Sequence, residues 1–237
     1  MVNSYVCVDI ETTGVRANQD KIIEIGALKI IDGKVVDTFQ ELINPERSIS
    51  PFITGLTGID DEMVRGCDTI EVVLPKFVEF AKDYPLLGHN LSFDYGFLKQ
   101  NADNLKIEFE KEGVDTLKIS RKVHKSLASK SLANMCEYYG IVDENHHRAF
   151  NDASITSMLY QKLQEEFGQE HKTLFESTKL KYREKKIEPI TEKQKKYLMD
   201  LYRHHRMEMD FDIDLLSRGE ASIKIDKILK EKGIKFY

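Results

Sequence analysis

The sequence is poor in cysteine and has no long apolar run, and both absences narrow the class of protein. No stretch approaches the roughly 20 consecutive apolar residues that a membrane-spanning helix needs, so no membrane partner is expected. Cys7, Cys67 and Cys136 are odd in number, far apart and not spaced as metal ligands, which is typical of free thiols in a reducing compartment. The N-terminus lacks the basic flank of a signal peptide and leads directly into a strand pattern. We therefore expect a cytoplasmic protein.

The chain also lacks a net positive charge, although it holds 35 Lys/Arg. The net charge is −5, whereas a protein that holds long duplex DNA by charge alone is usually basic. Residues 171–237 hold 17 Lys/Arg and 12 Asp/Glu, so this segment carries +5 and the remainder carries −10. An acidic body still binds a polyanion when divalent metal ions supply positive charge at the site. The charge therefore leaves the ligand open and directs attention to the carboxylates.

The spacing of apolar residues predicts a mixed α/β domain. Strands are expected at residues 5–10, 22–31, 35–43, 86–88 and 114–119. Helices are expected over residues 69–84, 92–102, 131–139 and 150–167. Asp32-Gly33 is a hairpin turn, so the first three strands should be antiparallel neighbours. Strands that first form a hairpin and then alternate with helices indicate a layered sheet with antiparallel and parallel strands, flanked by helices.

The chain is expected to divide into three parts. Residues 1–169 form the α/β domain, and residues 170–189, rich in Lys and Glu, form a linker or a solvated helix. Residues 190–237 predict a small helical appendage of two helices, over 191–206 and 215–232, whose role is open. Ser217 and Glu220 have the spacing of a capping box before the second helix. The basic residues of the appendage, residues 190–237, are interpreted either as phosphate contacts or, more plainly, as a solvated helix face.

An acidic pair ends the first predicted strand. Asp9 and Glu11 are two positions apart, so on a strand both side chains project from the same face. Like charges on one face of an apolar strand repel each other and resist burial, and a divalent cation between them removes both penalties. Thr12-Thr13-Gly14 ends the strand and leaves the acids at its carboxyl end, where α/β folds usually bind ligands. Taken alone, such a pair is more often a strand end that merely meets solvent.

The second acidic motif is His89-Asn90-Leu91-Ser92-Phe93-Asp94, between a predicted strand and a predicted helix. Asp94 falls in the first turn of that helix. There a carboxylate also stabilises the helix dipole by roughly 0.3 kcal/mol without any other role. Ser92 is an equally good N-cap in the structural interpretation. The motif alone is ambiguous.

The third motif is His146-His147-Arg148-Ala149-Phe150-Asn151-Asp152, directly before a predicted helix. In the plain interpretation Asp152 caps the helix and His147 is a surface residue. In the alternative, His147 is a base beside a metal ligand, because imidazole titrates near neutrality and can take a proton from water.

The three motifs in this order predict a metal site. Oxygen ligands without Cys or clustered His favour Mg²⁺ or Mn²⁺ over zinc. A pair of such ions about 3.5–4 Å apart suits phosphodiester hydrolysis, because it stabilises both the attacking and the leaving oxygen.

In these motifs the sequence resembles the DEDDh family of 3′–5′ exonucleases, which includes the proofreading subunits and domains of bacterial DNA polymerases. Residues 53–59, ITGLTGI, also resemble the family's segment between the first two motifs, and the similarity spans about residues 3–167. The resemblance implies a ribonuclease H-like fold. It also implies five catalytic residues, four of them acids that bind two divalent cations and one a general base: Asp9, Glu11, Asp94 and Asp152, and His147. Arg148 stands where a sister subgroup has Tyr, which favours the His branch.

The resemblance further implies contacts with the terminal nucleotide. The residues expected to make them are Thr12, Thr13, Leu56, Thr57, His89, Asn90 and Phe93. An apolar residue beside a Gly-rich turn can stack on a base, but core filling is the competing interpretation for Leu56 and Ile59.

The expected activity is 3′–5′ exonuclease hydrolysis that releases nucleoside monophosphates, first from DNA in proofreading or repair. Expected partners are single-stranded or frayed 3′ ends and a DNA polymerase or another replication protein. An exoribonuclease that trims RNA 3′ ends would use the same site. A phosphatase or phosphotransferase with Asp9 as nucleophile leaves His147 and Asp152 without a role. A non-catalytic polymerase-associated subunit would not need all five residues.

Overall fold

The structure is a computed structural model that describes residues 1–142, 148–182 and 188–232. The chain forms two compact units, Met1–Glu184 and Lys185–Tyr237. No helix within the described residues is both long enough and apolar enough to span a bilayer. The functional division into 1–169, 170–189 and 190–237 stays a prediction.

The first unit contains a mixed six-stranded sheet in the order β3-β2-β1-β4-β5-β6. Its strands are β1 Tyr5–Thr12, β2 Ile22–Ile31, β3 Lys34–Leu42, β4 Leu86–Gly88, β5 Glu112–Asp115 and β6 Thr178–Lys179. The first three strands are antiparallel neighbours, β1, β4 and β5 are parallel, and β6 is antiparallel to β5. This confirms the predicted combination of a hairpin and parallel strands.

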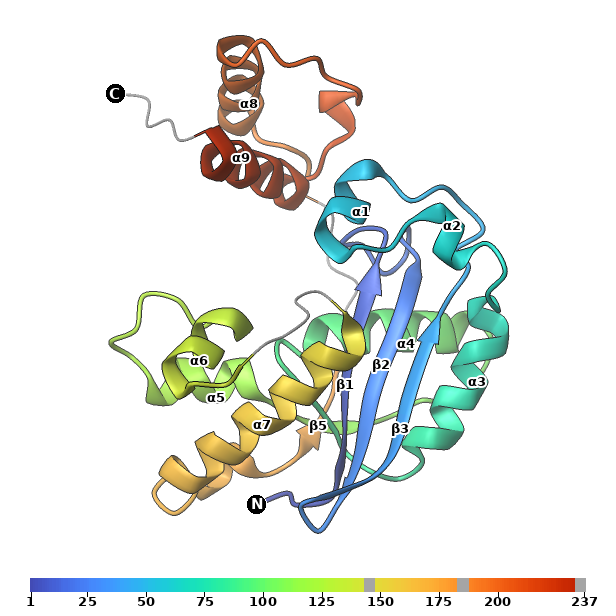
Figure 1. Ribbon diagram of the computed structural model, residues 1–237, viewed down its shortest axis with the longest axis vertical. Coiled ribbons are helices and arrows are strands. Elements are labelled where there is room, and N and C mark those ends of the chain that lie inside the picture. Colours follow the sequence, from blue (N-terminus) through green and yellow to red (C-terminus); the bar gives the residue numbers. More distant parts are fainter. Residues whose placement is uncertain (143–147, 183–187, 233–237) are drawn as a thin grey trace. The chain divides into compact units, whose positions relative to one another are not determined.

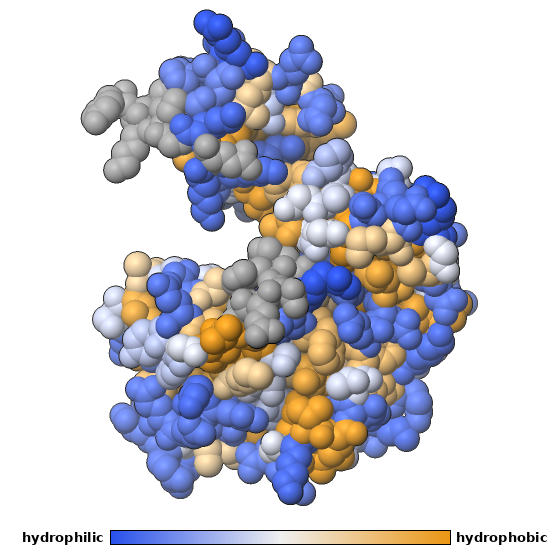
Figure 2. Space-filling view, viewed as in Figure 1, coloured by the Kyte–Doolittle hydropathy of each residue, from blue (hydrophilic) through white to orange (hydrophobic). Residues whose placement is uncertain are grey.

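Helices cover both faces of the sheet (Figure 1). They are α1 Pro51–Thr57, α2 Asp61–Val64, α3 Ile70–Ala81, α4 Ser92–Asn104, α5 Thr116–Val123, α6 Leu132–Tyr139 and α7 Ala149–Phe167. One core cluster joins alternate residues of β1 to α3 and α4, and a second joins the intervening residues of β1 to α7. The surface seen in Figure 2 is mostly hydrophilic, with hydrophobic side chains in separate patches.

The alternation along β1 decides which face carries its acids. Val6 and Val8 pack in the cluster with α3 and α4, whereas Tyr5 and Cys7 pack in the cluster with α7. Odd-numbered side chains of this strand therefore point towards α7. The same alternation places Asp9 on the α7 face.

The predicted strand at residues 114–119 is wrong in its second half. β5 ends at Asp115, whose carboxylate accepts hydrogen bonds from the backbone N–H groups of Leu117 at 3.0 Å and Lys118 at 3.4 Å. These bonds satisfy the free donors of a helix start, so α5 begins at Thr116. The apolar, β-branched composition of this stretch concealed the cap.

Part of the segment predicted as a linker packs into the first unit. Residues Lys172–Phe175 form a 3₁₀ turn, and β6 extends the sheet at its far edge. Phe175 is fully buried, with its ring 5.9 Å from that of Tyr160. Burial of an aromatic ring favours this packed arrangement over a solvated one.

Over its described residues, 188–232, the second unit contains two α-helices, as the apolar periodicity predicts: α8 Glu192–His204 and α9 Arg218–Lys232. They enclose a small core of their own that includes Leu198, Leu201 and Ile225. The predicted capping box is confirmed, because the carboxylate of Glu220 accepts from the N–H of Ser217 at 2.7 Å and the Ser217 hydroxyl accepts from the N–H of Glu220 at 3.2 Å.

The start of α7 lies directly on β2. A Cβ atom at Gly26 would be 2.0 Å from the backbone nitrogen of Phe150 and 2.3 Å from the carbonyl carbon of Ala149. Gly26 also lies opposite Asp9 in the β1–β2 register. A residue without a side chain is thus required for the helix to begin beside the acidic strand.

We expect Gly26→Ala to lower the free energy of unfolding by about 3 kcal/mol, because the added methyl group overlaps backbone atoms that cannot move alone. The matched control is Gly55→Ala in α1, where a Cβ meets no atom within 4 Å. Alanine at this open helical position should raise the free energy of unfolding by less than about 1 kcal/mol. Urea unfolding of both variants measures the difference, and an equal effect would contradict this account of Gly26.

Candidate active site

Three carboxylates from two elements meet at the carboxyl end of β1. Asp9 and Glu11 come from the strand, and Asp152 comes from the first turn of α7. One carboxylate oxygen from each lies within 4.8 Å of the others, and all three residues are partly buried. Residues separated by more than a hundred positions in the sequence therefore form one cluster of oxygen ligands.

Asp94 lies beside this cluster. It sits in the first turn of α4, is 3% exposed, and its carboxylate accepts a hydrogen bond from the N–H of Ile10 at 3.2 Å. Ile10 stands between the two acids of β1, so this bond fixes Asp94 next to them. The N-cap of α4 is Leu91, without a side-chain cap, so the structural role predicted for Ser92 is wrong.

The surroundings make the acids hard to ionise. Burial raises the pKa of Asp9 well above its ordinary value, and the charges of Asp94, Asp152, Glu11 and Glu24 raise it further. Burial likewise raises the pKa of Glu11 to about 8, with the charge of Asp152 as the next cause. The pKa of Asp94 rises to about 8 for the same first reason. Perturbation of several neighbouring carboxyls is typical of functional sites.

The cluster fits a divalent cation by its chemistry. Its donors are carboxylate oxygens, which suit hard ions such as Mg²⁺ and Mn²⁺. A cation also offsets the mutual repulsion that raises these pKa values. The geometry thus joins the acids of all three predicted motifs, whereas His147 lies outside the described residues.

Glu24 is a residue of this site that the sequence analysis did not single out. It is fully buried on β2, directly opposite Glu11 in the register. Its carboxylate accepts from Nη2 of Arg148 at 2.8 Å, from Nε of Arg148 at 3.2 Å and from the N–H of Ala149 at 3.0 Å. A charged residue inside the apolar run Ile22–Ile25 was the available signal. This ion pair ties the start of α7, and with it Asp152, to the sheet.

The predicted substrate residues at the end of β1 and in α1 differ in whether their side chains are available to contact a ligand. The hydroxyl of Thr12 donates to the carbonyl of Gly14 at 2.5 Å, and that of Thr13 accepts from the N–H of Lys21 at 2.9 Å. Thr57 is buried, and its hydroxyl donates to Ile53 within α1. Leu56 is 46% exposed on the same helix. Of these four, Leu56 is the one whose side chain presents an open apolar surface.

The predicted substrate residues at and just before the start of α4 already contact other groups of the protein. The ring of His89 contacts the hydroxyl of Thr116 and the carbonyl of Lys130, both at 2.8 Å. The N–H of Asn90 donates to Asp115 at 3.0 Å, and Phe93 packs beside Phe97 with ring centroids 5.1 Å apart. Contacts of these residues with a nucleotide stay predictions.

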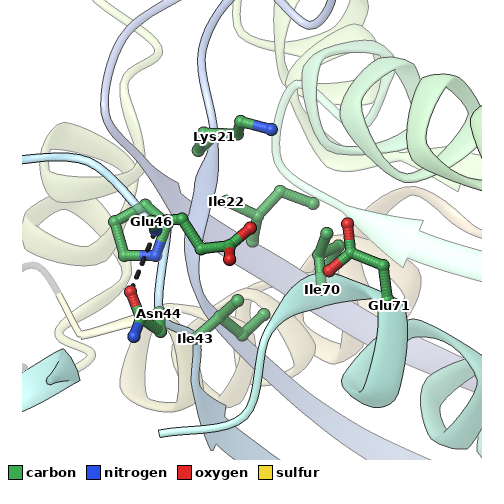
Figure 3. A pocket seen from close by; sticks show the side chains of 8 residues that line it. Lys21, Ile22, Ile43, Asn44, Glu46, Ile70 and Glu71 are labelled. Atoms are coloured by element: carbon green, nitrogen blue, oxygen red, sulfur yellow. Dashed lines mark hydrogen bonds between the residues drawn. The ribbon is translucent and has the colours of Figure 1, made fainter. Parts of the chain in front are cut away.

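A separate shallow pocket lies between the start of β2 and the start of α3 (Figure 3). Its lining residues are Lys21, Ile22, Ile43, Asn44, Pro45, Glu46, Ile70 and Glu71. None of the residues predicted for the site belongs to it. The acid cluster, rather than this pocket, is therefore the candidate active site.

Comparisons with known proteins agree with this geometry. The family model described as Exonuclease matches residues 6–160. The chain is 45% identical over 161 residues to the PolC-type DNA polymerase III of Caldanaerobacter subterraneus subsp. tengcongensis, which is 68% of this chain and 12% of that polymerase. The chain thus corresponds to a small part of the length of this relative.

Solved structures share the fold. Exonuclease X in complex with 5′ overhanging duplex DNA is 26% identical, with a TM-score of 0.57 over 69% of this chain and 93% of that one. The nuclease domain of 3′hExo, described as a DEDDh family member bound to rAMP, is 22% identical, with a TM-score of 0.59 over 69% and 92% of the two chains. The ribonuclease H-like architecture is thereby confirmed.

In a chelating buffer, we expect the free energy of unfolding to fall as the pH rises from about 4 to about 8. Glu11 and Asp94 keep their protons up to about pH 8 in the folded state, whereas unfolded carboxyls lose them near pH 4. The folded state then binds more protons over this interval, so raising the pH favours unfolding. Asp9→Asn removes one of the repelling charges, so the free energy of unfolding of this variant should fall less than that of the wild type over the same pH interval. Urea unfolding at both ends of the range tests this, and equal losses in the two proteins would contradict it.

Arg148→Ala should lower the free energy of unfolding by about 2–3 kcal/mol, because it leaves the buried carboxylate of Glu24 without its cation. The matched control is Arg65→Ala, since Arg65 pairs with Glu62 at 2.7 Å where both side chains are more than two-thirds exposed. That loss should stay below about 1 kcal/mol. Similar losses in the two variants would show that the buried pair does not stabilise the start of α7.

Proposed function

Because this chain belongs to the exonuclease family whose model matches residues 6–160, we propose that, like the DEDDh 3′–5′ exonucleases that its motifs resemble, it hydrolyses the terminal phosphodiester bond of a nucleic acid strand. The products are a nucleoside 5′-monophosphate and a strand shorter by one nucleotide. The observation that carries the proposal is the meeting of Asp9, Glu11 and Asp152, with Asp94 beside them.

The four acids are the proposed ligands of two divalent cations, Mg²⁺ or Mn²⁺. When bound, such a pair stabilises the attacking and leaving oxygens of a phosphoryl displacement. The protein's own contribution is to hold the carboxylates in place before the ions arrive. Asp94 is held through the N–H of Ile10, and the start of α7 through Glu24 and Gly26.

His147 is the proposed general base. It follows the motif order and immediately precedes Arg148, which Glu24 fixes against the sheet. A neutral imidazole takes a proton from the attacking water as the new phosphorus–oxygen bond forms. The bond from phosphorus to the 3′ oxygen of the preceding nucleotide breaks, and that oxygen leaves with a proton from solvent.

The proposed substrate is the 3′ end of DNA, single-stranded or frayed, in proofreading or repair. Support comes from the PolC-type polymerase relative, although the chain matches 12% of its length. A DNA polymerase is accordingly the proposed partner of residues 1–169, with the part of 170–189 that does not pack into the first unit as a connection and 190–237 as an accessory module. Trimming of RNA 3′ ends is the second candidate, and the similar fold of a nuclease domain bound to rAMP favours testing it.

Oligonucleotides labelled at the 3′ or the 5′ end, as DNA and as RNA, test the proposal. With Mg²⁺ or Mn²⁺ the 3′ label should be released first as a mononucleotide, whereas a chelator should abolish release. Asp9→Asn should lower the rate by at least about 1000-fold, and His147→Ala by roughly 100-fold or more, since base catalysis contributes about that much.

Glu46→Gln, in the separate pocket, provides the control and should act like the wild type. Release of the 5′ label first, or full activity of folded Asp9→Asn, would refute the assignment. A higher rate on RNA than on the matched DNA would make RNA 3′ ends, rather than DNA 3′ ends, the substrate.

A further inference from the structure

A row of positive side chains runs along the exposed face of α5 and continues just past the end of this helix at Val123. Lys118, Arg121 and Lys122 follow the spacing i, i+3 and i+4, which places them on one side of the helix, and Lys125 follows two residues after its end. All four are exposed, whereas Ile119 and Ser120 on the other side are buried. We call these four residues the basic stripe.

The basic stripe stands out in an acidic domain. Residues 116–136 hold five Lys/Arg and no Asp or Glu, whereas the rest of residues 1–170 holds 13 Lys/Arg against 28 Asp/Glu. Lys118 lies 3.8 Å from Asp115. Within the described parts of the chain, no acidic group pairs with Arg121, Lys122 or Lys125 inside 4.0 Å. Positive charge without local partners attracts a polyanion.

Cations elsewhere on this unit behave differently. Lys99 pairs with Asp103 at 2.8 Å and with Glu110 at 2.6 Å. Lys82 pairs with Glu79 at 2.9 Å. Among the described residues of this unit, the cations of the other α-helices therefore have acidic partners, and the basic stripe departs from that pattern.

The basic stripe begins at the edge of the candidate active site. The N-cap of α5, Asp115, accepts from the N–H of Asn90, and the first residue of the helix, Thr116, contacts the ring of His89. Burial lowers the pKa of His89, and the positive charge of Arg121 is near enough to lower it further. His89 and Asn90 lead directly into α4, which carries Asp94. The basic stripe and the acid cluster therefore flank one short segment, residues 89–94.

We propose that the basic stripe binds the phosphate backbone of the strand whose 3′-terminal nucleotide lies at the acid cluster. This rests on the proposed function. Lys118 and Lys122 are about 6 Å apart along the helix axis, and Lys125 extends the basic stripe beyond the helix end, so the stripe is long enough to contact a few consecutive phosphates. The occupant is thus a short stretch of single strand upstream of the bond that is cut. The contact is with phosphates and carries no sequence preference.

The test neutralises three residues and keeps the Lys118–Asp115 pair: Arg121→Gln, Lys122→Gln and Lys125→Gln together. Glutamine preserves helix propensity. Binding of a labelled single-stranded DNA 12-mer is measured by anisotropy in chelator at several salt concentrations. Loss of about two phosphate contacts should reduce the slope of log Kd against log salt by roughly 1.4. With Mg²⁺, KM for the 12-mer should rise about tenfold at unchanged kcat, and KM for a dinucleotide should not change.

The matched control removes three exposed cations that, among the described residues, also have no acidic group within 4.0 Å and that lie at the opposite end of the sheet: Lys34→Gln, Lys106→Gln and Lys172→Gln. It changes the net charge equally and should keep the wild-type slope. Thermal unfolding confirms that each variant is folded, and Arg121→Gln alone serves if the triple variant is not. An unchanged slope in the stripe variant, or an equal loss in the control, would overturn the proposal.

The two proposals fail separately in this design. Wild-type protein that binds the strand through the basic stripe but releases no nucleotide from the 12-mer or the dinucleotide would refute the exonuclease assignment alone. If the wild-type protein releases nucleotides and the stripe variant has an unchanged KM for the 12-mer, the phosphate contact alone is refuted. The same variants with an RNA 12-mer show whether the contact distinguishes the two sugars.

Discussion

Repulsion between carboxylates in a poorly hydrated place is the constraint on which this structure depends. Asp9 and Glu11 leave the same face of a buried strand, and Asp94 and Asp152 approach them from two helices. Such an arrangement works against folding unless protons or cations neutralise it. The rest of the domain supplies the opposing stability through two apolar clusters, one on each face of the sheet. A destabilising centre is thereby held in a stable frame, which is common at functional sites.

The start of α7 is the part of the frame most closely tied to that centre. Gly26 removes the side chain that would keep the helix away from β2, and Glu24 anchors Arg148 and Ala149 at the same place. Both features lie within one turn of Asp152. The strand that pairs with the acidic strand thus fixes the helix that completes the cluster, by close backbone contact and by a buried ion pair. Packing and electrostatics act on the same few residues.

Much of the fold and of the candidate site followed from local patterns. The period of two in β1 gave the shared face of Asp9 and Glu11, and the hairpin turn gave three antiparallel strands. The predictions were weaker where one hydrogen bond or one distant partner decides the outcome. Asp115 converts an apolar, strand-like stretch into the start of α5. The role of Glu24 depends on Arg148, 124 positions away, and no local periodicity reports such a pair.

The assembly of the acid cluster from both ends of the domain also bears on how the chain matures. Asp9 lies near the beginning of the first unit and Asp152 is 143 positions later. Contacts between residues this far apart in the sequence form late in folding, because the entropy cost of closing a long loop comes before the contacts stabilise the chain. A nascent chain that has exposed only its first hairpin therefore holds half of the ligand set. The proposed ligand set would therefore be complete only after α7, which carries Asp152, has left the ribosome and packed on the sheet.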